Sequence, residues 1–281
     1  MNKNQFYDRL ISVSDGVFWT GAYESGAALQ CNPYIVTASG QAVLIDGGSR
    51  SDFAAVMMKI LQAEVDPKQI VALIYQHADP DLCGSLSNIV DICQNDSLKV
   101  FSNKGDTEFL KYYIHRERAH LIESIDTHDF QYTFGGRTLQ FHSTPYAHSS
   151  GGYITHDLQT GTLFTSDLFG SFSFGAFSQE WELFLELPEA CFSCTDYQDC
   201  KAGKLICPVL NILNFHKKVM PCGRALKNAM SVVRRLSPKM IAPQHGSIIA
   251  HQRDIVFLID RLERLENVGV DGIPMCNEVD E

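Results

Sequence analysis

The sequence predicts a layered α/β fold, and three observations point to it. Short apolar runs rich in β-branched residues recur along the chain, and amphipathic segments with a helical period lie between them. Of the 281 residues, 45% are hydrophobic and 20% are charged, as in an ordinary folded protein with a sizeable core. We find no internal repeat and no Ser/Gly linker, so we expect a single domain over residues 1–281 in which helices cover sheets.

Eight segments are predicted as strands because they are short, apolar and β-branched. They are residues 17–20, 34–37, 42–46, 71–77, 99–102, 138–144, 162–166 and 239–243. Three segments are predicted as helices because their apolar residues recur every three or four positions. They are residues 53–61, 86–93 and 255–265. The apolar stripe of the last helix suits core packing, and its flanking charges also suit the surface of a homodimer or a partner surface.

The charge balance excludes several classes of partner. Lys and Arg number 23 against 33 for Asp and Glu, which gives a formal net charge of −10. A protein that binds a phosphate backbone needs a basic face, so we expect no nucleic-acid partner. No apolar run approaches the roughly 20 residues that span a bilayer, and the N-terminus lacks the apolar segment of a secretory signal. We therefore expect a cytoplasmic protein without a membrane partner.

Histidines and aspartates follow four of the predicted strands directly, where side chains meet at the rim of a sheet. They are His77, Asp79, Asp81, His148, Asp167 and His245. A single histidine after a strand is more often a hydrogen-bonded rim residue than a ligand, and we assign the remaining histidines to that class. Imidazole nitrogens and carboxylate oxygens are metal donors, and here four strands deliver them together. The series therefore predicts a metal site.

This order of residues resembles the metallo-β-lactamase superfamily. The pattern is His-x-acid-x-Asp-x-x-Gly, followed by a His, an Asp and Pro-x-His-Gly, and the resemblance runs from about Gly16 to His251. More narrowly, the chain is similar to the di-iron domain of flavodiiron proteins and to stand-alone oxygen-binding di-iron proteins. The resemblance implies a four-layer αββα sandwich with a non-heme di-iron site.

The resemblance also implies a ligand for each of two metal ions. One ion would be held by His77, Asp79 and His148, the other by Asp81 and His245, and Asp167 would bridge them. Three imidazoles and three carboxylates suit an oxophilic metal, so we expect two iron ions, with zinc as the open alternative.

Two positions depart from the relatives of the superfamily. Zinc hydrolases have histidines where Asp79 and Leu82 stand, and flavodiiron proteins have a glutamate at the position of Asp79. Aspartate is one methylene shorter than glutamate. Either the turn at Pro80 brings Asp79 inward, or Asp79 lies outside the ring of direct ligands.

The resemblance implies that dioxygen or NO binds at the site. Flavodiiron reductases receive electrons from a flavodoxin-like domain, and only a short segment follows residue 265, so we expect no flavin on this chain. Phe172 stands where the family commonly has a histidine, which predicts a drier pocket that supplies few protons. Both features favour an oxygen or iron sensor with a signalling partner, or a gas-handling protein with a separate electron donor. A zinc-dependent hydrolase of an ester, thioester or lactone is the alternative, and a metal-poor interaction protein is a third reading. We assign no catalytic residue.

A cluster of cysteines lies in a stretch at about 186–222 that is longer than usual in the family, and we interpret this stretch as an insertion. The cluster is Cys191, Cys194, Cys200 and Cys207. The spacing C-x2-C-x5-C-x6-C could form a second metal or redox site. One C-x2-C without a matching pair is a weak signal, so we favour packed thiols. Cys83 is also predicted to be a packed residue rather than a ligand.

Overall fold

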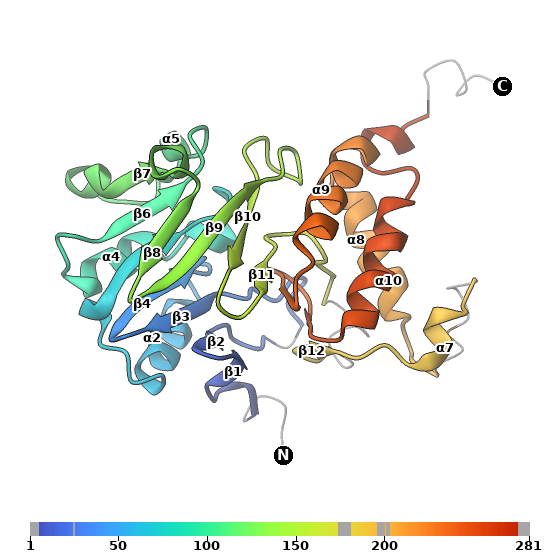
Figure 1. Ribbon diagram of the computed structural model, residues 1–281, viewed down its shortest axis with the longest axis horizontal. Helices are drawn as coiled ribbons and strands as arrows, with labels where there is room; N and C mark the ends of the chain where they lie inside the picture. Colours follow the sequence, from blue (N-terminus) through green and yellow to red (C-terminus); the bar gives the residue numbers. More distant parts are fainter. Residues whose placement is uncertain (1–5, 25, 174–180, 196–199, 201–202, 275–281) are drawn as a thin grey trace.

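The computed structural model describes residues 6–24, 26–173, 181–195, 200 and 203–274. In this part of the chain, two seven-stranded sheets pack face to face and helices lie on the outer side of each sheet (Figure 1). The predicted αββα sandwich is confirmed. None of the helices described is both long and apolar enough to cross a lipid bilayer.

The first sheet has the order β1-β2-β3-β4-β5-β6-β7. Its strands are β1 (Ile11–Ser14), β2 (Val17–Trp19), β3 (Tyr34–Ala38), β4 (Gln41–Ile45), β5 (Ile70–Ile74), β6 (Lys99–Ser102) and β7 (Ile122–Ser124). Neighbours from β1 to β4 are antiparallel, and those from β4 to β7 are parallel.

The second sheet has the order β12-β14-β13-β11-β10-β9-β8. Its strands are β8 (Gln131–Phe134), β9 (Arg137–Ser143), β10 (Tyr153–Asp157), β11 (Thr162–Phe164), β12 (Phe184–Leu185), β13 (Met240–Ala242) and β14 (Ile248–Ile249). All eight predicted strands are present. Of the strands that sequence reasoning missed, β8 is short and partly exposed, and β10 is almost fully buried but ends in the polar run Thr155, His156 and Asp157.

The helices form the two outer layers. On the first sheet lie α2 (Phe53–Gln62), α3 (Pro80–Cys83), α4 (Leu86–Cys93) and α5 (Thr107–Leu110). On the second lie α7 (Glu189–Phe192), α8 (Pro208–Val219), α9 (Gly223–Leu236) and α10 (Gln252–Glu263). The three predicted helices correspond to α2, α4 and α10. The apolar stripe of α10 is buried in the core beneath the second sheet, as core packing requires.

Residues 186–222, which the sequence analysis interprets as an insertion, contain the regular helix α8. Its buried face includes Val209, Ile212 and Phe215, which pack in or against the core of the second sheet. The helical period was present in the sequence, but the buried polar residues Asn211 and His216 interrupt its apolar face and hid it. That this stretch is an insertion stays a prediction.

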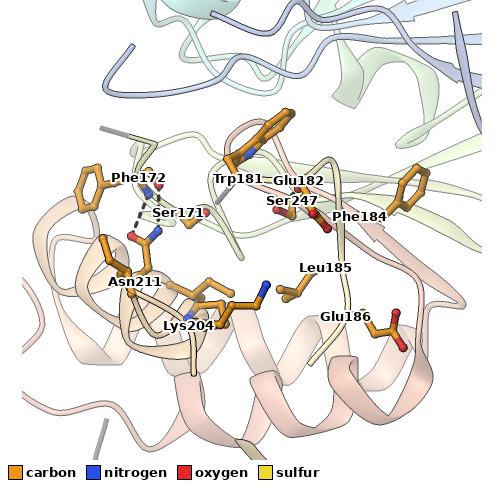
Figure 2. A pocket seen from close by; sticks show the side chains of 13 residues that line it. Ser171, Phe172, Trp181, Glu182, Phe184, Leu185, Glu186, Lys204, Asn211 and Ser247 are labelled. Carbon is orange, nitrogen blue, oxygen red and sulfur yellow. Dashed lines mark hydrogen bonds between the residues drawn. The ribbon is translucent and has the colours of Figure 1, made fainter. Parts of the chain in front are cut away.

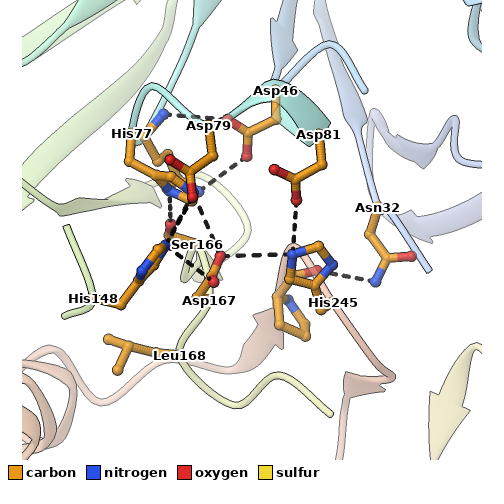
Figure 3. A network of polar contacts seen from close by, with 12 residues as sticks. Asn32, Asp46, His77, Asp79, Asp81, His148, Ser166, Asp167, Leu168 and His245 are labelled. Carbon is orange, nitrogen blue, oxygen red and sulfur yellow. Dashed lines mark hydrogen bonds and ion pairs between the residues drawn. The ribbon is translucent and has the colours of Figure 1, made fainter. Parts of the chain in front are cut away.

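The topology places the predicted site at one rim of the sandwich. In the second sheet, β11 is parallel to β13 and antiparallel to β10, which is antiparallel to β9. The carboxyl ends of β9, β11 and β13 therefore share one edge. The loop after β5 of the first sheet approaches the same edge. Its residue His77 contacts Ser166 and Asp167 of the loop after β11 (Figure 3).

Candidate metal centre

The six predicted ligands converge on one cluster, although they come from four loops (Figure 3). In the first half of the cluster, His148 Nε2 lies 3.3 Å from Asp79 Oδ2 and 3.3 Å from Asp167 Oδ2. His77 Nε2 lies 3.6 Å from Asp79 Oδ2 and 3.8 Å from Asp167 Oδ1. The two imidazole Nε2 atoms face each other at 3.4 Å. The donor atoms of four side chains therefore surround one small volume.

The second half of the cluster forms around His245. Its Nε2 atom lies 3.0 Å from Asp81 Oδ2 and 3.9 Å from Asp167 Oδ1. Donor atoms of Cys31, Asp81 and His245 all lie within 4.8 Å of one another. Asp167 lies between the two halves, which is the position expected of a bridging carboxylate.

Outer hydrogen bonds orient two of the imidazoles. His77 Nδ1 lies 2.8 Å from Ser166 Oγ, and His245 Nδ1 lies 3.1 Å from the carbonyl oxygen of Gln30. A carbonyl oxygen only accepts, so Nδ1 of His245 carries a proton, and Nε2 is the ring atom that faces the carboxylates of the cluster. Such second partners are typical of histidines that bind metals. Ser166 immediately precedes Asp167. One loop therefore supplies both the Asp167 carboxylate and the hydroxyl that is hydrogen-bonded to the His77 ring.

A buried histidine from α8 holds the loop that carries Asp167. His216 Nε2 accepts a hydrogen bond from the Phe169 amide at 2.9 Å, and Nδ1 donates to the Ile212 carbonyl at 2.7 Å. Burial lowers the pKa of His216 to about 4, so this ring is neutral. Sequence reasoning placed His216 among the hydrogen-bonded rim histidines; it is hydrogen-bonded as expected, but it lies fully buried on α8 and not at the rim of a sheet.

The carboxylates make the cluster strongly attractive to positive charge. Burial by itself lowers the pKa of His77, but Asp167 and Asp79 outweigh it and raise this pKa to about 9. Hydrogen bonds from His148 and His77 hold the pKa of Asp79 far below its usual range. Behind His77, Asp46 accepts hydrogen bonds from Gln76, and burial raises its pKa to about 7. A divalent cation can supply the charge that protons otherwise provide.

One buried atom at the centre has no hydrogen-bond partner among the described residues. This atom is Asp167 Oδ1, on a side chain that is only 6% exposed. Burying a carboxylate oxygen without a hydrogen-bond partner costs folding free energy. Proteins therefore pair such oxygens with hydrogen-bond donors or use them to bind a cation. Because Oδ1 faces both His77 and His245, a metal ion fits the donor set.

The turn at Pro80 favours Asp79 as a direct ligand. Asp79 has extended backbone immediately before α3, and Pro80 occupies the first turn of that helix. This places Asp79 Oδ2 between two imidazoles despite the shorter side chain. Leu82 is fully buried in the core under the first sheet, and Cys83 is buried with its thiol directed at the His77 carbonyl oxygen, 3.5 Å away. Neither of these two side chains is placed as a metal ligand.

The cysteine cluster differs from the metal cluster in geometry. Cys191 and Cys207 are buried in the core of the second sheet, and Cys200 packs against it. Within the described part of the chain, no three of the four cysteines bring their sulfur atoms within 4.8 Å of one another. A second metal or redox site there stays a prediction.

A separate cavity of about 90 Å³ lies behind the loops that carry Asp167 and His245 (Figure 2). Ser171, Phe172 and Ser247 contribute to its wall, and none of the predicted ligands does. The ring of Phe172 packs edge-on against Phe215 at 5.1 Å, and Phe215 lies 6.1 Å from the ring of His245. Phe172 thus stands one aromatic layer away from the cluster, where it shields His245 indirectly.

Sequence reasoning missed Cys31, Ser166 and Asp46 as neighbours of the cluster. Cys31 precedes the strand that became β3 and is far in sequence from Asp81 and His245, so no local spacing signalled it. Ser166 and Asp46 each stand at the end of a predicted strand, beside residues that were singled out, and this position was the available signal.

Comparison with known proteins was made for the sequence and for the fold. Residues 29–246 match the family described as ODP family beta lactamase. Diflavin flavoprotein A 1 of Synechocystis sp. is 27% identical over 222 residues, which are 78% of this chain and 34% of that protein. The chain spans about a third to a little over half of the length of the curated relatives it matches.

Two solved structures share the fold. Rubredoxin oxygen:oxidoreductase from Desulfovibrio gigas has a TM-score of 0.71 at 18% identity, over 90% of this chain and 60% of that one. The peroxy di-iron species of the chemotaxis sensor ODP has a TM-score of 0.69 at 21% identity, over 93% of this chain and 96% of that one.

Proposed function

The chain belongs to the ODP family of beta lactamases, and on this premise we propose that its cluster holds two non-heme iron ions and binds dioxygen or NO. The observation that carries the proposal is Asp167 Oδ1, a buried oxygen without a hydrogen-bond partner among the described residues, between two sets of donors. The names of the relatives point the same way, since they include a rubredoxin oxygen:oxidoreductase and a peroxy di-iron sensor.

The proposed ligands are those of the sequence analysis. One position is formed by His77, His148 and Asp79, the other by Asp81 and His245, and Asp167 serves both. Oxygen donors equal nitrogen donors in this set, which favours iron over zinc. Bound ferrous ions would supply the electrons and the open coordination positions that a diatomic gas requires.

The surroundings favour gas binding over rapid reduction. The Asp79 side chain is 47% exposed and that of His148 is 23% exposed, so the first position is where a small gas reaches the cluster. Buried apolar side chains lie next to the ligands, among them Leu168 and Phe215, and they offer no protons. A sensor that signals to a partner protein fits this environment, and a reductase would need a separate electron donor. Dimerisation and a cytoplasmic location stay predictions.

Metal analysis followed by an oxygen titration tests the proposal. Protein purified without added metal should contain about two iron atoms per chain. After anaerobic loading with ferrous salt, oxygen should produce a new visible absorption band, and His148→Ala should abolish it. His120→Ala is the matched control, because His120 is exposed and its ring is hydrogen-bonded to the Glu117 carbonyl rather than to a proposed ligand. Stoichiometric zinc with ester or lactone turnover would replace the proposal by a hydrolase, and protein that refuses ferrous ions would refute it.

A further inference from the structure

Cys31 is held against the cluster by the backbone rather than by a flexible side chain. It forms an isolated antiparallel bridge with His245. The next residue, Asn32, reinforces this bridge: its backbone N–H donates a hydrogen bond to the Gln244 carbonyl oxygen at 2.9 Å. The Asn32 side chain donates to the carbonyls of Pro243 and Gly246 at 3.1 and 2.9 Å. These bonds fix the distance between the segment before β3 and the loop after β13.

The Asn32 side chain is itself anchored, because its oxygen accepts a hydrogen bond from Trp19 Nε1 at 2.9 Å. Asn32 and Trp19 are both fully buried. Gly246 adds to the precision of the loop, since its φ of +81° and its close approach to Ser171 leave no room for a side chain. Cys31 therefore has a defined position with respect to His245.

The thiol of Cys31 reaches the donors of the second position. Its sulfur lies within 4.8 Å of the ligand atoms of Asp81 and His245. His245 donates from Nδ1 to Gln30, the residue before Cys31, so Nε2 remains directed at the cluster. Asp167 Oδ1, which accepts no hydrogen bond from any described residue, faces the same volume, 3.9 Å from His245 Nε2.

Without Cys31, the two metal positions have different numbers of donor side chains. The first has four donor side chains, and the second has three, because Leu82 stands where zinc hydrolases of the superfamily have a histidine. Leu82 is fully buried and cannot contribute. A cysteine at the second position restores four donors, the number that closes a tetrahedral site.

We propose that Cys31 Sγ is a direct ligand at the second metal position, together with Asp81, His245 and Asp167. This inference rests on the proposed function, since it needs the cluster to bind metal. Binding displaces the thiol proton to solvent, and the thiolate adds one negative charge, so two ferrous ions with three carboxylates and one thiolate form a neutral centre. The thiolate is a softer donor than a carboxylate and makes the second position the one that accepts zinc or cobalt more readily.

Cobalt binding tests the inference, because a thiolate ligand gives cobalt a charge-transfer band in the near ultraviolet. We would titrate the full chain anaerobically with Co²⁺ and compare it with Cys31→Ser. The wild type should develop this band together with visible bands. Cys31→Ser should lose the near-ultraviolet band, keep the visible bands of the first position, and bind its second cobalt at least about tenfold more weakly. Cys222→Ser is the matched control, since Cys222 lies in another part of the fold and is also partly exposed.

Alkylation supplies a second readout. Cobalt should protect Cys31 from iodoacetamide, as measured by mass spectrometry, and leave Cys222 unprotected. Two cobalt ions without a thiolate band, or an equal band in Cys31→Ser, would overturn the inference and leave the metal centre standing. Wild-type protein that binds no cobalt and no ferrous ion would overturn both proposals.

Discussion

Replacing Ser166 by alanine tests whether the outer hydrogen bonds tune the metal centre. Ser166 Oγ lies 2.8 Å from His77 Nδ1, and both groups are buried. In Ser166→Ala the Nδ1 proton loses its acceptor, and the ring no longer has a preferred tautomer or orientation. Partners of this kind contribute about 10-fold to 100-fold to metal affinity, or about 1.4–2.7 kcal/mol. We expect Ser166→Ala to bind metal more weakly than the wild type by this factor.

The affinity can be measured by anaerobic competition for ferrous or cobalt ions against a chromophoric chelator. The stability of the metal-free protein is measured separately by urea denaturation with excess chelator, where an unpaired buried donor costs about 1–3 kcal/mol. Ser102→Ala is the control, because Ser102 is also buried and donates to the Tyr75 carbonyl at 2.8 Å without touching a proposed ligand. It should lose stability and keep its metal affinity. Equal affinities of Ser166→Ala and the wild type, or equal losses in both variants, would refute the reasoning.

Two predictions concern buried charges in the scaffold. Burial lowers the pKa of Lys59 from 10.5 to about 7, so the unfolded chain binds more protons above pH 7 and the contribution of Lys59 to the unfolding free energy rises with pH. Urea denaturation at pH 7 and pH 9 should show a rise about 2 kcal/mol larger in the wild type than in Lys59→Met, and parallel values would contradict it. Burial raises the pKa of Asp157, but the Arg137 guanidinium, which donates from Nε at 2.9 Å, more than offsets this. Arg137→Met should therefore cost about 3–5 kcal/mol at pH 7 and less at pH 4, where Asp157 of the variant is protonated; a cost below about 1 kcal/mol would count against a buried ion pair.

The solvent exposure of the side chains in the cluster indicates from which side a gas can enter. The Asp79 side chain is 47% exposed, whereas those of Asp167 and His245 are 6% and 2% exposed. Both positions therefore border solvent through a carboxylate, because Asp81 of the second position is 32% exposed, and each is backed by a buried imidazole, His77 or His245.

The layered α/β class and the six candidate residues were predictable from local patterns, whereas the αββα sandwich was implied by the resemblance to the metallo-β-lactamase superfamily. Apolar runs such as Val71–Ile74 mark buried strands, and the polar residues that follow them must lie at a rim, whichever strands are neighbours. Helices α8 and α9 were missed although α9 buries Leu226, Ala229, Met230 and Val233 at helical spacing. The period of α8 was overlooked because the cysteines led us to interpret residues 186–222 as a loop-rich insertion.

The sequence alone determined the kinds of donor available and the strand ends from which they come, because these follow from residue type and short-range periodicity. Only the tertiary structure decided that Asp79 turns inward, that Ser166 supports His77, and that Cys31 lies against His245. Each of these contacts joins residues that are distant along the chain or depends on one turn of backbone. Sheet order and loop hydrogen bonds, such as those of Asn32, set such distances, and no local pattern encodes them.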